Sequence, residues 1–456
     1  MSLLTQNSVR GGAWVTSREL TWTSLVTRHR KWIAAAFAVC ALYGLGIALV
    51  STDYLHRDWG FMAACGYGLA AVAVLVWRSR GADLALALSL CGAVLVPLAW
   101  MATTGQGQPE VIVVLRSAEL LVHHGTPYEA PGLLRHTTNP NAYDPYLPPM
   151  TFFALLWTVA PHNPLADPRV WFGIVFVVCF GLALRVARAR DVVRWTVFVT
   201  ATPIIALELA VGGTDVPIIA LICLGFALMW KHPRPILAGL AFGGAASMKA
   251  TAWPALIVAV SLALARDGKR AAAIMTAVAL AVFAVLVGPF IALQPESLIR
   301  NTISFPLGLA SVTSQASSPL PGHLIAGTGH IGRLCVIAAL VLVALAIGAS
   351  LIFRPPRNVP AAATRLIIAL TVMFVLAPAT RFGYFIYPGA ILAWLLLVLL
   401  TQPAEFAPDG YGPPPDPFTR PPDPPAPTRL PPRASRSGPD HSGRLFYKSC
   451  PKVFPN

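Results

Sequence analysis

Residues 108–149 decide the fold, and they open with Gln108-Pro-Glu-Val-Ile-Val-Val-Leu-Arg-Ser-Ala-Glu-Leu-Leu-Val-His-His-Gly-Thr-Pro-Tyr128. The segment closes with Tyr143-Asp-Pro-Tyr-Leu-Pro-Pro149. It is polar and acidic, whereas apolar runs of membrane-spanning length recur around it from Trp32 to Leu400. A carboxylate at a membrane edge, followed by an amphipathic stretch, Gly-x-Pro-Tyr and Pro-Pro, indicates a chemical site rather than a connecting loop.

The composition excludes an ordinary soluble protein, because 56% of the residues are hydrophobic and only 12% are charged. The formal net charge of +15 is better explained by membrane topology than by nucleic-acid binding, since Lys and Arg gather in cytoplasmic loops. We therefore expect a membrane setting and no nucleic-acid partner. Six of the seven cysteines lie in or beside apolar runs, without a CxxC or His-Cys cluster, and we predict neither disulfides nor a metal site.

Hydropathy predicts an all-α polytopic membrane protein with about twelve transmembrane helices. The predicted spans are roughly 32–50, 60–77, 83–102, 169–187, 194–211, 215–230, 235–249, 252–266, 271–292, 333–353, 363–379 and 382–401. Six basic clusters, at 28–31, 78–80, 185–194, 231–234, 266–270 and 354–365, fall on one side if both termini are cytoplasmic. This orientation leaves two large outer loops, 103–168 and 293–332. We expect the protein in the plasma membrane.

One apolar segment is too short to be a span. Residues 149–161 (PMTFFALLWTVAP) cannot cross ~30 Å of hydrocarbon as a helix. Counting them as a span would also move the arginine-rich loop 185–194 to the outside. We expect a re-entrant or interfacial helix with both ends extracytoplasmic, a structure that survives at membrane depth only when it is buried in protein or lines a cavity.

The two ends of the chain differ from this core. Residues 1–31 form a predicted cytoplasmic segment, and the transmembrane domain is expected over 32–401. Sixteen of the 42 prolines lie in 402–456, which predicts a disordered, polyproline-like cytoplasmic tail.

Glu110 opens a helix-like stretch whose apolar positions include Val113, Val114 and Ala118, so this helix is expected on the membrane surface. A carboxylate there can accept a proton from a sugar hydroxyl as a general base. The alternative is that Glu110 only complements the helix dipole from the first turn. Asp58, in the short loop region after the first span, is a rival carboxylate that can equally be a helix cap.

A family resemblance bears on this choice. The pattern Glu110-x-x-Val-x-x-x-x-Ala118, with Gly125-x-Pro-Tyr128 and Pro148-Pro149, resembles the first-loop signature of glycosyltransferase family 87. Four later motifs are also similar to the family's: Gly212-Gly-Thr-Asp-Val216, Ser247-Met-Lys-Ala-Thr-Ala252, Ser317-Ser-Pro-Leu-Pro-Gly-His323 and Ala377-Pro-Ala-Thr-Arg-Phe-Gly-Tyr384. The resemblance covers roughly residues 100–400. It implies a GT-C-like fold and an activity like that of polyprenol-phosphate-mannose-dependent α-mannosyltransferases.

The chain departs from the family pattern at two positions. Glu110 stands where the family usually has Asp, and Gly383 stands where the family has a late His, with Arg381 nearby. Two additional spans also precede the signature loop.

What the resemblance implies is transfer of a hexose, mannose above all, from a polyprenyl-phosphate donor to an extracytoplasmic glycan or glycolipid. Glu110 would be the catalytic base, and Lys249 and Arg381 would bind the donor phosphate. The alternative for Lys249 is snorkelling to the interface. Candidate acceptor or sugar contacts are Tyr128, Asp144, Tyr146, Asp215 and His323. A monophosphate leaving group that is paired with protein cations needs no cofactor, and none is expected.

Two other functions stay open from the sequence. Twelve spans and the intramembrane Glu208 are compatible with a transporter or lipid flippase, although no repeated halves are evident. The departures at Glu110 and Gly383 are compatible with a non-catalytic relative that only binds a polyprenyl glycolipid.

Overall fold

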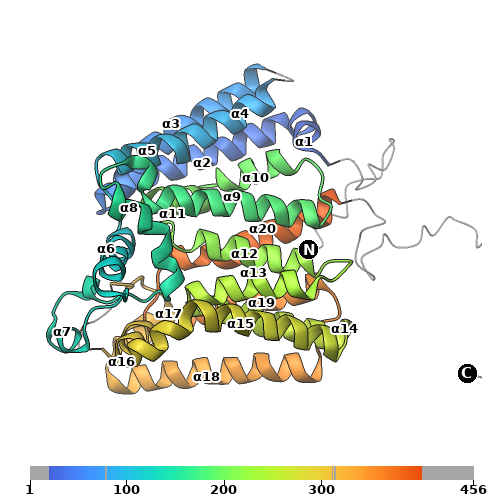
Figure 1. The fold of residues 1–456 in the computed structure, drawn as a ribbon. Coiled ribbons are helices and arrows are strands. Elements are labelled where there is room, and N and C mark those ends of the chain that lie inside the picture. The colour runs from blue at the N-terminus through green and yellow to red at the C-terminus, as the bar shows by residue number, and fades with distance from the viewer. Residues whose placement is uncertain (1–19, 78–79, 311, 313–314, 403–456) are drawn as a thin grey trace, which may run out of the picture. The chain divides into compact units, whose positions relative to one another are not determined.

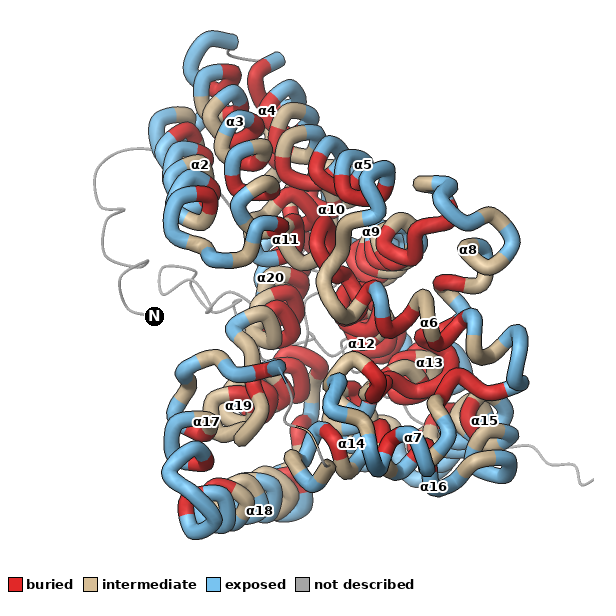
Figure 2. The backbone as a smooth tube through the Cα atoms, turned by 90° about the vertical axis from the view of Figure 1, so that its left-hand side faces the viewer, coloured by how far each residue is buried: buried red, intermediate tan, exposed pale blue. Residues whose placement is uncertain are grey.

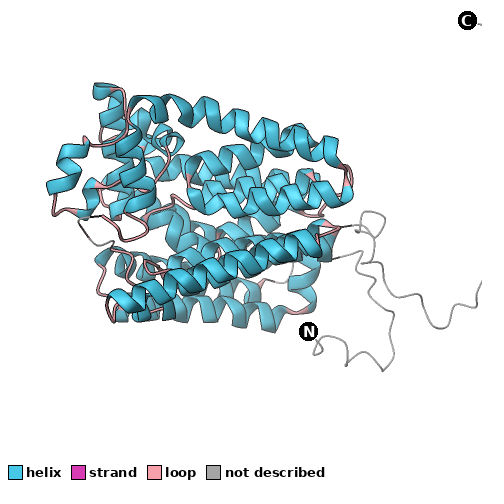
Figure 3. Ribbon diagram, turned by 90° about the horizontal axis from the view of Figure 1, so that it is seen from below, coloured by secondary structure: helices cyan, strands magenta, loops and turns pink. Residues whose placement is uncertain are grey.

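The computed structural model describes residues 20–77, 80–310, 312 and 315–402, and these residues form a helical bundle (Figures 1 and 3). Its α-helices are α1 (Trp22–Arg28), α2 (Arg30–Val50), α3 (Tyr54–Val76), α4 (Gly81–Leu90), α5 (Val96–Thr103), α6 (Pro109–His124), α7 (Pro131–His136), α8 (Leu155–Val159), α9 (Pro168–Val186), α10 (Val192–Thr200), α11 (Pro203–Val211), α12 (Val216–Leu228), α13 (Pro235–Met248), α14 (Trp253–Arg266), α15 (Lys269–Leu293), α16 (Pro295–Ile299), α17 (Pro321–Ala326), α18 (His330–Phe353), α19 (Val359–Leu376) and α20 (Ile386–Thr401).

Short 3₁₀ and π turns connect or interrupt these helices. They are η2 (Cys91–Leu95), η3 (Pro140–Ala142), η4 (Pro148–Ala154), η5 (Pro164–Ala166), η6 (Ala250–Ala252), η7 (Arg300–Ser304) and η8 (Phe382–Phe385). The β-structure of the described residues is limited to an isolated bridge between Ser317 and Thr380. The expected all-α polytopic membrane protein is therefore confirmed.

Eight helical segments are long and apolar enough to cross a membrane, or nine if the bent pair α10–α11 is one span. They correspond to eight of the twelve predicted spans, so the number twelve is not shown. The other predicted spans coincide with the bent pair and with three short helical segments: α12, α13 and the segment from η6 through α14.

The short helix α12 lies at the centre of the bundle, and eleven of its residues are buried (Figure 2). Its 13 residues span ~20 Å, less than the ~30 Å of a hydrocarbon core. A helix that is apolar on all sides is suited to such a position, because protein surrounds it instead of lipid.

Two breaks in the long helices have a local cause in proline. Pro97 has no N–H to bond the carbonyl of Ala93, and the Trp59 indole donates to that carbonyl at 2.8 Å beside the π turn η2. Thr202 is extended because it precedes Pro203, and α10 and α11 consequently meet at a 65° bend. The Tyr67 hydroxyl donates to the carbonyl of Ala201 at this bend, at 2.6 Å.

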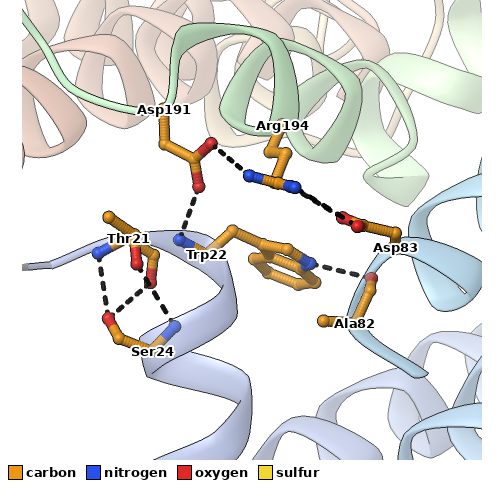
Figure 4. Close-up of polar contacts among 7 residues, drawn as sticks. All are labelled: Thr21, Trp22, Ser24, Ala82, Asp83, Asp191 and Arg194. Atoms are coloured by element: carbon orange, nitrogen blue, oxygen red, sulfur yellow. Dashed lines mark hydrogen bonds and ion pairs between the residues drawn. The ribbon is translucent and has the colours of Figure 1, made fainter. Parts of the chain in front are cut away.

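Polar contacts join the N-terminal helices to the bundle at the end away from α6, α7 and α8 (Figure 1). There the indole of Trp22 donates to the carbonyl of Ala82 at 2.8 Å, and its backbone N–H donates to Asp191 at 2.8 Å (Figure 4). Arg194 pairs with Asp83 and Asp191. These contacts link α1 to α4 and α10.

The segment expected to be re-entrant forms η4 followed by α8. The first half is largely buried, whereas none of the five residues of α8 is buried. The combined helix Pro148–Val159 falls below the length of a candidate span. Which side of a membrane its two ends face stays a prediction. The predicted cytoplasmic tail, from residue 403 onward, lies outside the described residues.

Candidate active site

A polar cavity of about 460 Å³ lies where α6, α11, α12 and η8 approach one another. Seven acidic, basic or imidazole side chains line it: Asp53, His56, Glu110, Glu208, Asp215, Lys249 and Arg381. Of the residues that the sequence singled out, it brings together the proposed base, both proposed phosphate-binding cations, Asp215 and Tyr146.

Glu110 reaches the cavity from the first turn of α6. The preceding residue, Pro109, occupies the first helical position, and the backbone N–H of Gln108 donates to the carbonyl of Val211 at 2.9 Å. This contact anchors the start of α6 on the end of α11. The Glu110 carboxylate forms an ion pair with Arg381, and its other oxygen, Oε2, is buried without a hydrogen-bond partner among the described residues.

Lys249 and Asp215 form the second ion pair of the cavity, at 2.6 Å. Asp215 occupies the N-cap position of α12, but its side chain makes no capping bond; it accepts instead from Lys249 and from the hydroxyl of Tyr387, the latter at 2.9 Å. Lys249 follows the last residue of α13 and is only 9% exposed. Its ammonium is therefore held in a buried ion pair and does not extend outward, as the snorkelling alternative requires.

Aromatic side chains surround the Lys249 ammonium. The nitrogen lies 5.3 Å from the ring centroid of Tyr146 and 5.1 Å from that of Tyr384, within the range of cation–π attraction. The Tyr146 hydroxyl shares a hydrogen bond of 3.2 Å with Thr214. Burial raises the pKa of the Tyr146 hydroxyl well above its usual range, so this group stays neutral.

A loop contact positions Arg381. The backbone N–H of Thr380 donates to the carbonyl of Ala316, and that of Ser318 donates to the carbonyl of Thr380, each at 2.9 Å. His323 makes a 2.9 Å hydrogen bond with the carbonyl of Pro378. His323 therefore supports the loop before Arg381 and does not line the cavity.

Three more candidates from the sequence lie away from the cavity. Asp144 is buried and accepts from the Ser117 hydroxyl at 2.6 Å and from a backbone amide, while Tyr128 is buried and donates to the carbonyl of Tyr146 at 2.9 Å. Asp58, the rival base, does not line it either, whereas its neighbour Asp53 does. The contacts of Asp144 and Tyr128 are structural, and direct sugar binding by these residues stays an untested prediction.

An apolar cavity of about 320 Å³ adjoins the polar one. It extends past Phe305 and Leu340 to Met373 and Phe374 of α19. Both cavities share the residues Pro109, Glu110, Tyr146, Lys249, Gln315, Arg381 and Tyr384. The two ion pairs thus lie at the junction of an apolar and a polar space.

Sequence reasoning assigned no role to several lining residues, among them His56, Gln108 and Tyr384, although the last two lie in motifs that it quoted. Their signal is weak, because each is a single polar or aromatic residue beside an apolar run. Among the described residues, no group of three or more His, Cys, Asp or Glu is arranged to hold a metal ion.

The sequence model of glycosyltransferase family 87 matches residues 145–378, just over half of the chain. The chain belongs to glycosyltransferase family 87. This match contains Tyr146, Asp215 and Lys249 but begins after Glu110 and ends before Arg381. The expected family is confirmed, and the chain is a multi-pass membrane protein.

Two further comparisons describe the chain's relatives. The crystal structure of ArnT from Cupriavidus metallidurans in the apo state is similar to this structure with a TM-score of 0.45 and 17% sequence identity. The alignment covers 71% of this chain and 60% of that one, so this family 87 chain spans less than two thirds of that relative. No curated protein sequence matches the chain significantly.

Proposed function

We propose that this family 87 protein transfers a hexose, with mannose as the first candidate, from a polyprenyl-phosphate donor to an extracytoplasmic glycan or glycolipid. The junction of the two cavities carries this proposal. An apolar space that ends at two cations and a carboxylate suits a ligand with a hydrocarbon chain, a phosphate and a sugar.

In the proposed reaction, an acceptor hydroxyl oxygen attacks the anomeric carbon of the donor sugar. The bond from that carbon to the phosphate oxygen breaks, and polyprenyl phosphate leaves with the electron pair. Glu110 takes the hydroxyl proton, and its unpartnered Oε2 is the atom available for this. A single displacement of this kind inverts the anomeric configuration.

The two cations have complementary tasks in this reaction. Lys249 and Arg381 line both cavities and lie where the leaving phosphate would develop its charge. Each is already held by a carboxylate, Lys249 by Asp215 and Arg381 by Glu110. Positions fixed in this way need little reorganisation when the phosphate leaves.

Purified protein in detergent, supplied with labelled polyprenyl-phosphate hexoses and a membrane extract, tests this function. We expect labelled mannose to appear in the extracted glycans. The matched control supplies the same labelled sugar on a nucleotide, without any lipid-linked donor, and should give no product. Transfer from the nucleotide sugar alone, or no transfer from any lipid-linked hexose, would contradict the proposal.

A further inference from the structure

We infer that the wall of the polar cavity formed by Asp53, His56, Gln108 and Glu208, here called the acidic wall, binds the acceptor, and that Glu208 is its anchor. The acceptor group that suits this wall is an uncharged sugar with neighbouring hydroxyls. This inference rests on the proposed function and adds the place and chemistry of acceptor recognition.

The position of the acidic wall follows from the two cavities. Its four residues line the polar cavity but not the apolar one, whereas Glu110, Lys249 and Arg381 line both. If the lipid chain of the donor occupies the apolar cavity, its phosphate meets the cations at the junction. The acceptor then approaches from the remaining space, with Glu110 between the two substrates.

Glu208 is the most unusual residue of this wall. It lies in the last turn of α11, and the hydrogen bonds and ion pairs of the described residues do not include its carboxylate. Glu208 is half-buried and lines the cavity, so its carboxylate oxygens are free to accept hydrogen bonds from a ligand there. An acceptor hydroxyl would supply such a hydrogen bond.

Gly383 makes room for this carboxylate. A Cβ placed on Gly383 would overlap Oε1 of Glu208 and lie 3.1 Å from its Cδ. Any larger residue at position 383 would therefore displace the Glu208 side chain. The glycine and the half-buried acid are therefore in close contact, although they lie far apart in sequence.

The charge distribution decides the class of acceptor. The two cations of the polar cavity, Lys249 and Arg381, lie at the junction where the donor phosphate is proposed to bind, and the described residues that line the cavity include no further Lys or Arg. The wall itself offers two carboxylates, one imidazole and one amide. The carboxylate and amide oxygens accept hydrogen bonds from hydroxyls, and the two carboxylates repel a carboxylate or phosphate on the acceptor.

The N-terminal helices complete the wall. Asp53 caps α3 by accepting from the backbone N–H of Leu55 at 2.9 Å, and His56 lies in the first turn of that helix. The His56 ring hydrogen-bonds the Gln108 amide at 2.8 Å. The hairpin of α2 and α3 therefore contributes Asp53 and His56 to the cavity, and His56 contacts Gln108, the residue before α6.

The test compares Glu208→Ala, Gly383→Ala and the double variant. The acceptor is a glycolipid extract of cells that lack the gene, which retain the unmodified acceptor. Glu208→Ala should raise the half-saturating amount of extract roughly tenfold or more, as expected for loss of a hydrogen bond to a charged group. The half-saturating donor concentration should change by less than about twofold, a split that a general loss of folding does not produce.

Gly383→Ala should reproduce this defect by displacing the carboxylate, and in the double variant it should add nothing to the effect of Glu208→Ala. Gly348→Ala is the matched control, since a Cβ there meets nothing within 4 Å. Additive effects, or a change in donor saturation instead of acceptor saturation, would overturn the inference. If wild-type protein gives no transfer at all, the proposed function itself fails.

Discussion

Glu110 and Arg381 illustrate how single residues acquire a role in this protein. They are 271 positions apart, and each lies at the end of an apolar segment. Their ion pair orients one carboxylate oxygen and leaves the other without a partner. That arrangement suits a general base that is held by one atom and reacts through the other.

Replacing Glu110 by Gln should lower sugar transfer by ~10²–10⁴-fold, the usual cost of removing a positioned general base. Rates of transfer by purified variants, normalised to the amount of folded protein, measure this effect. Glu119→Gln on the exposed face of α6 is the matched control and should keep normal activity. Glu110→Asp restores the residue that the family usually has, and we expect it to remain active.

An inactive Glu119→Gln variant would mean that sugar transfer requires the negative charge of α6 and not specifically a base at Glu110. Normal turnover by Glu110→Gln together with an inactive Asp58→Asn would instead move the base to Asp58, which lies within the first turns of α3 and not in the loop expected from the sequence.

Asp144 has a structural rather than a catalytic environment, and it predicts a pH dependence of stability. Burial raises the pKa of its carboxyl to about 6, although the Ser117 hydroxyl, the Tyr146 amide and Arg116 act in the opposite direction. Because an unfolded aspartate titrates near ~3.9, folding favours the protonated form. Its contribution to stability is complete below about pH 4 and is lost as the pH rises through about 6.

Thermal unfolding in detergent between pH 4.5 and 7.5 should show this loss for the wild-type protein, on the order of a few kcal/mol. Asp144→Asn keeps the shape but cannot ionise, so its stability should fall less over the same range. Parallel curves for the two proteins would rule out Asp144 as the titrating group.

At the scale of elements, the contact of α2 with α3 determines where Asp53 and His56 lie. The two helices approach closely at small residues: a Cβ on Gly60 would lie 2.7 Å from the backbone nitrogen of Ala48. Backbone cannot give way as a flexible side chain can. The proximity of the helices therefore requires glycine at this position.

Gly60→Ala should separate α2 from α3 and destabilise the protein by ~1–3 kcal/mol, the usual cost of overpacking. Gly68→Ala in the same helix meets nothing within 4 Å and should be neutral or stabilising by up to ~1 kcal/mol, because alanine is the better helix former. Melting temperatures of the two variants in detergent give the comparison. Equal stability would show that the helix pair adjusts freely.

At the scale of the whole molecule, the cavity depends on helices of unequal length. α12 and α13 have 13 and 14 residues, whereas α9 and α15 have 19 and 25. Asp215 and Lys249 lie at the ends of the two short helices, and both are buried. Short helices enclosed by longer ones thus provide a recess for charges that would be costly in contact with lipid.

The topology of the first outer loop is testable at this scale. If residues 149–161 do not cross the membrane, cysteines introduced at the exposed positions Thr138 and Asn163 should both react with an impermeant maleimide on intact cells. The background protein has its exposed cysteines replaced. His232→Cys, in a loop predicted to be cytoplasmic, should react only after permeabilisation. Labelling of Thr138→Cys and Asn163→Cys on opposite sides would disprove the predicted topology.

Local sequence was sufficient to predict many of the helices of this protein and its family. Apolar runs led to twelve predicted spans, of which eight correspond to helices of spanning length, and the polar segment after Thr103 predicted that Glu110 opens a helix. These properties depend on neighbours within a few turns, since helix formation and hydrophobic length are local. The matched motifs around Asp215 and Lys249 likewise indicated the family before any geometry was known.

Only the tertiary structure decided which polar residues meet. It joined Glu110 to Arg381 and Lys249 to Asp215, and it showed that Asp144 accepts from Ser117 and that Tyr128 donates to the carbonyl of Tyr146. It also brought Glu208 beside Gly383 and placed the start of α3 in the cavity. The physical reason is that these side-chain contacts depend on how the ends of helices far apart in sequence pack together. Hydropathy indicates only which segments are buried away from water.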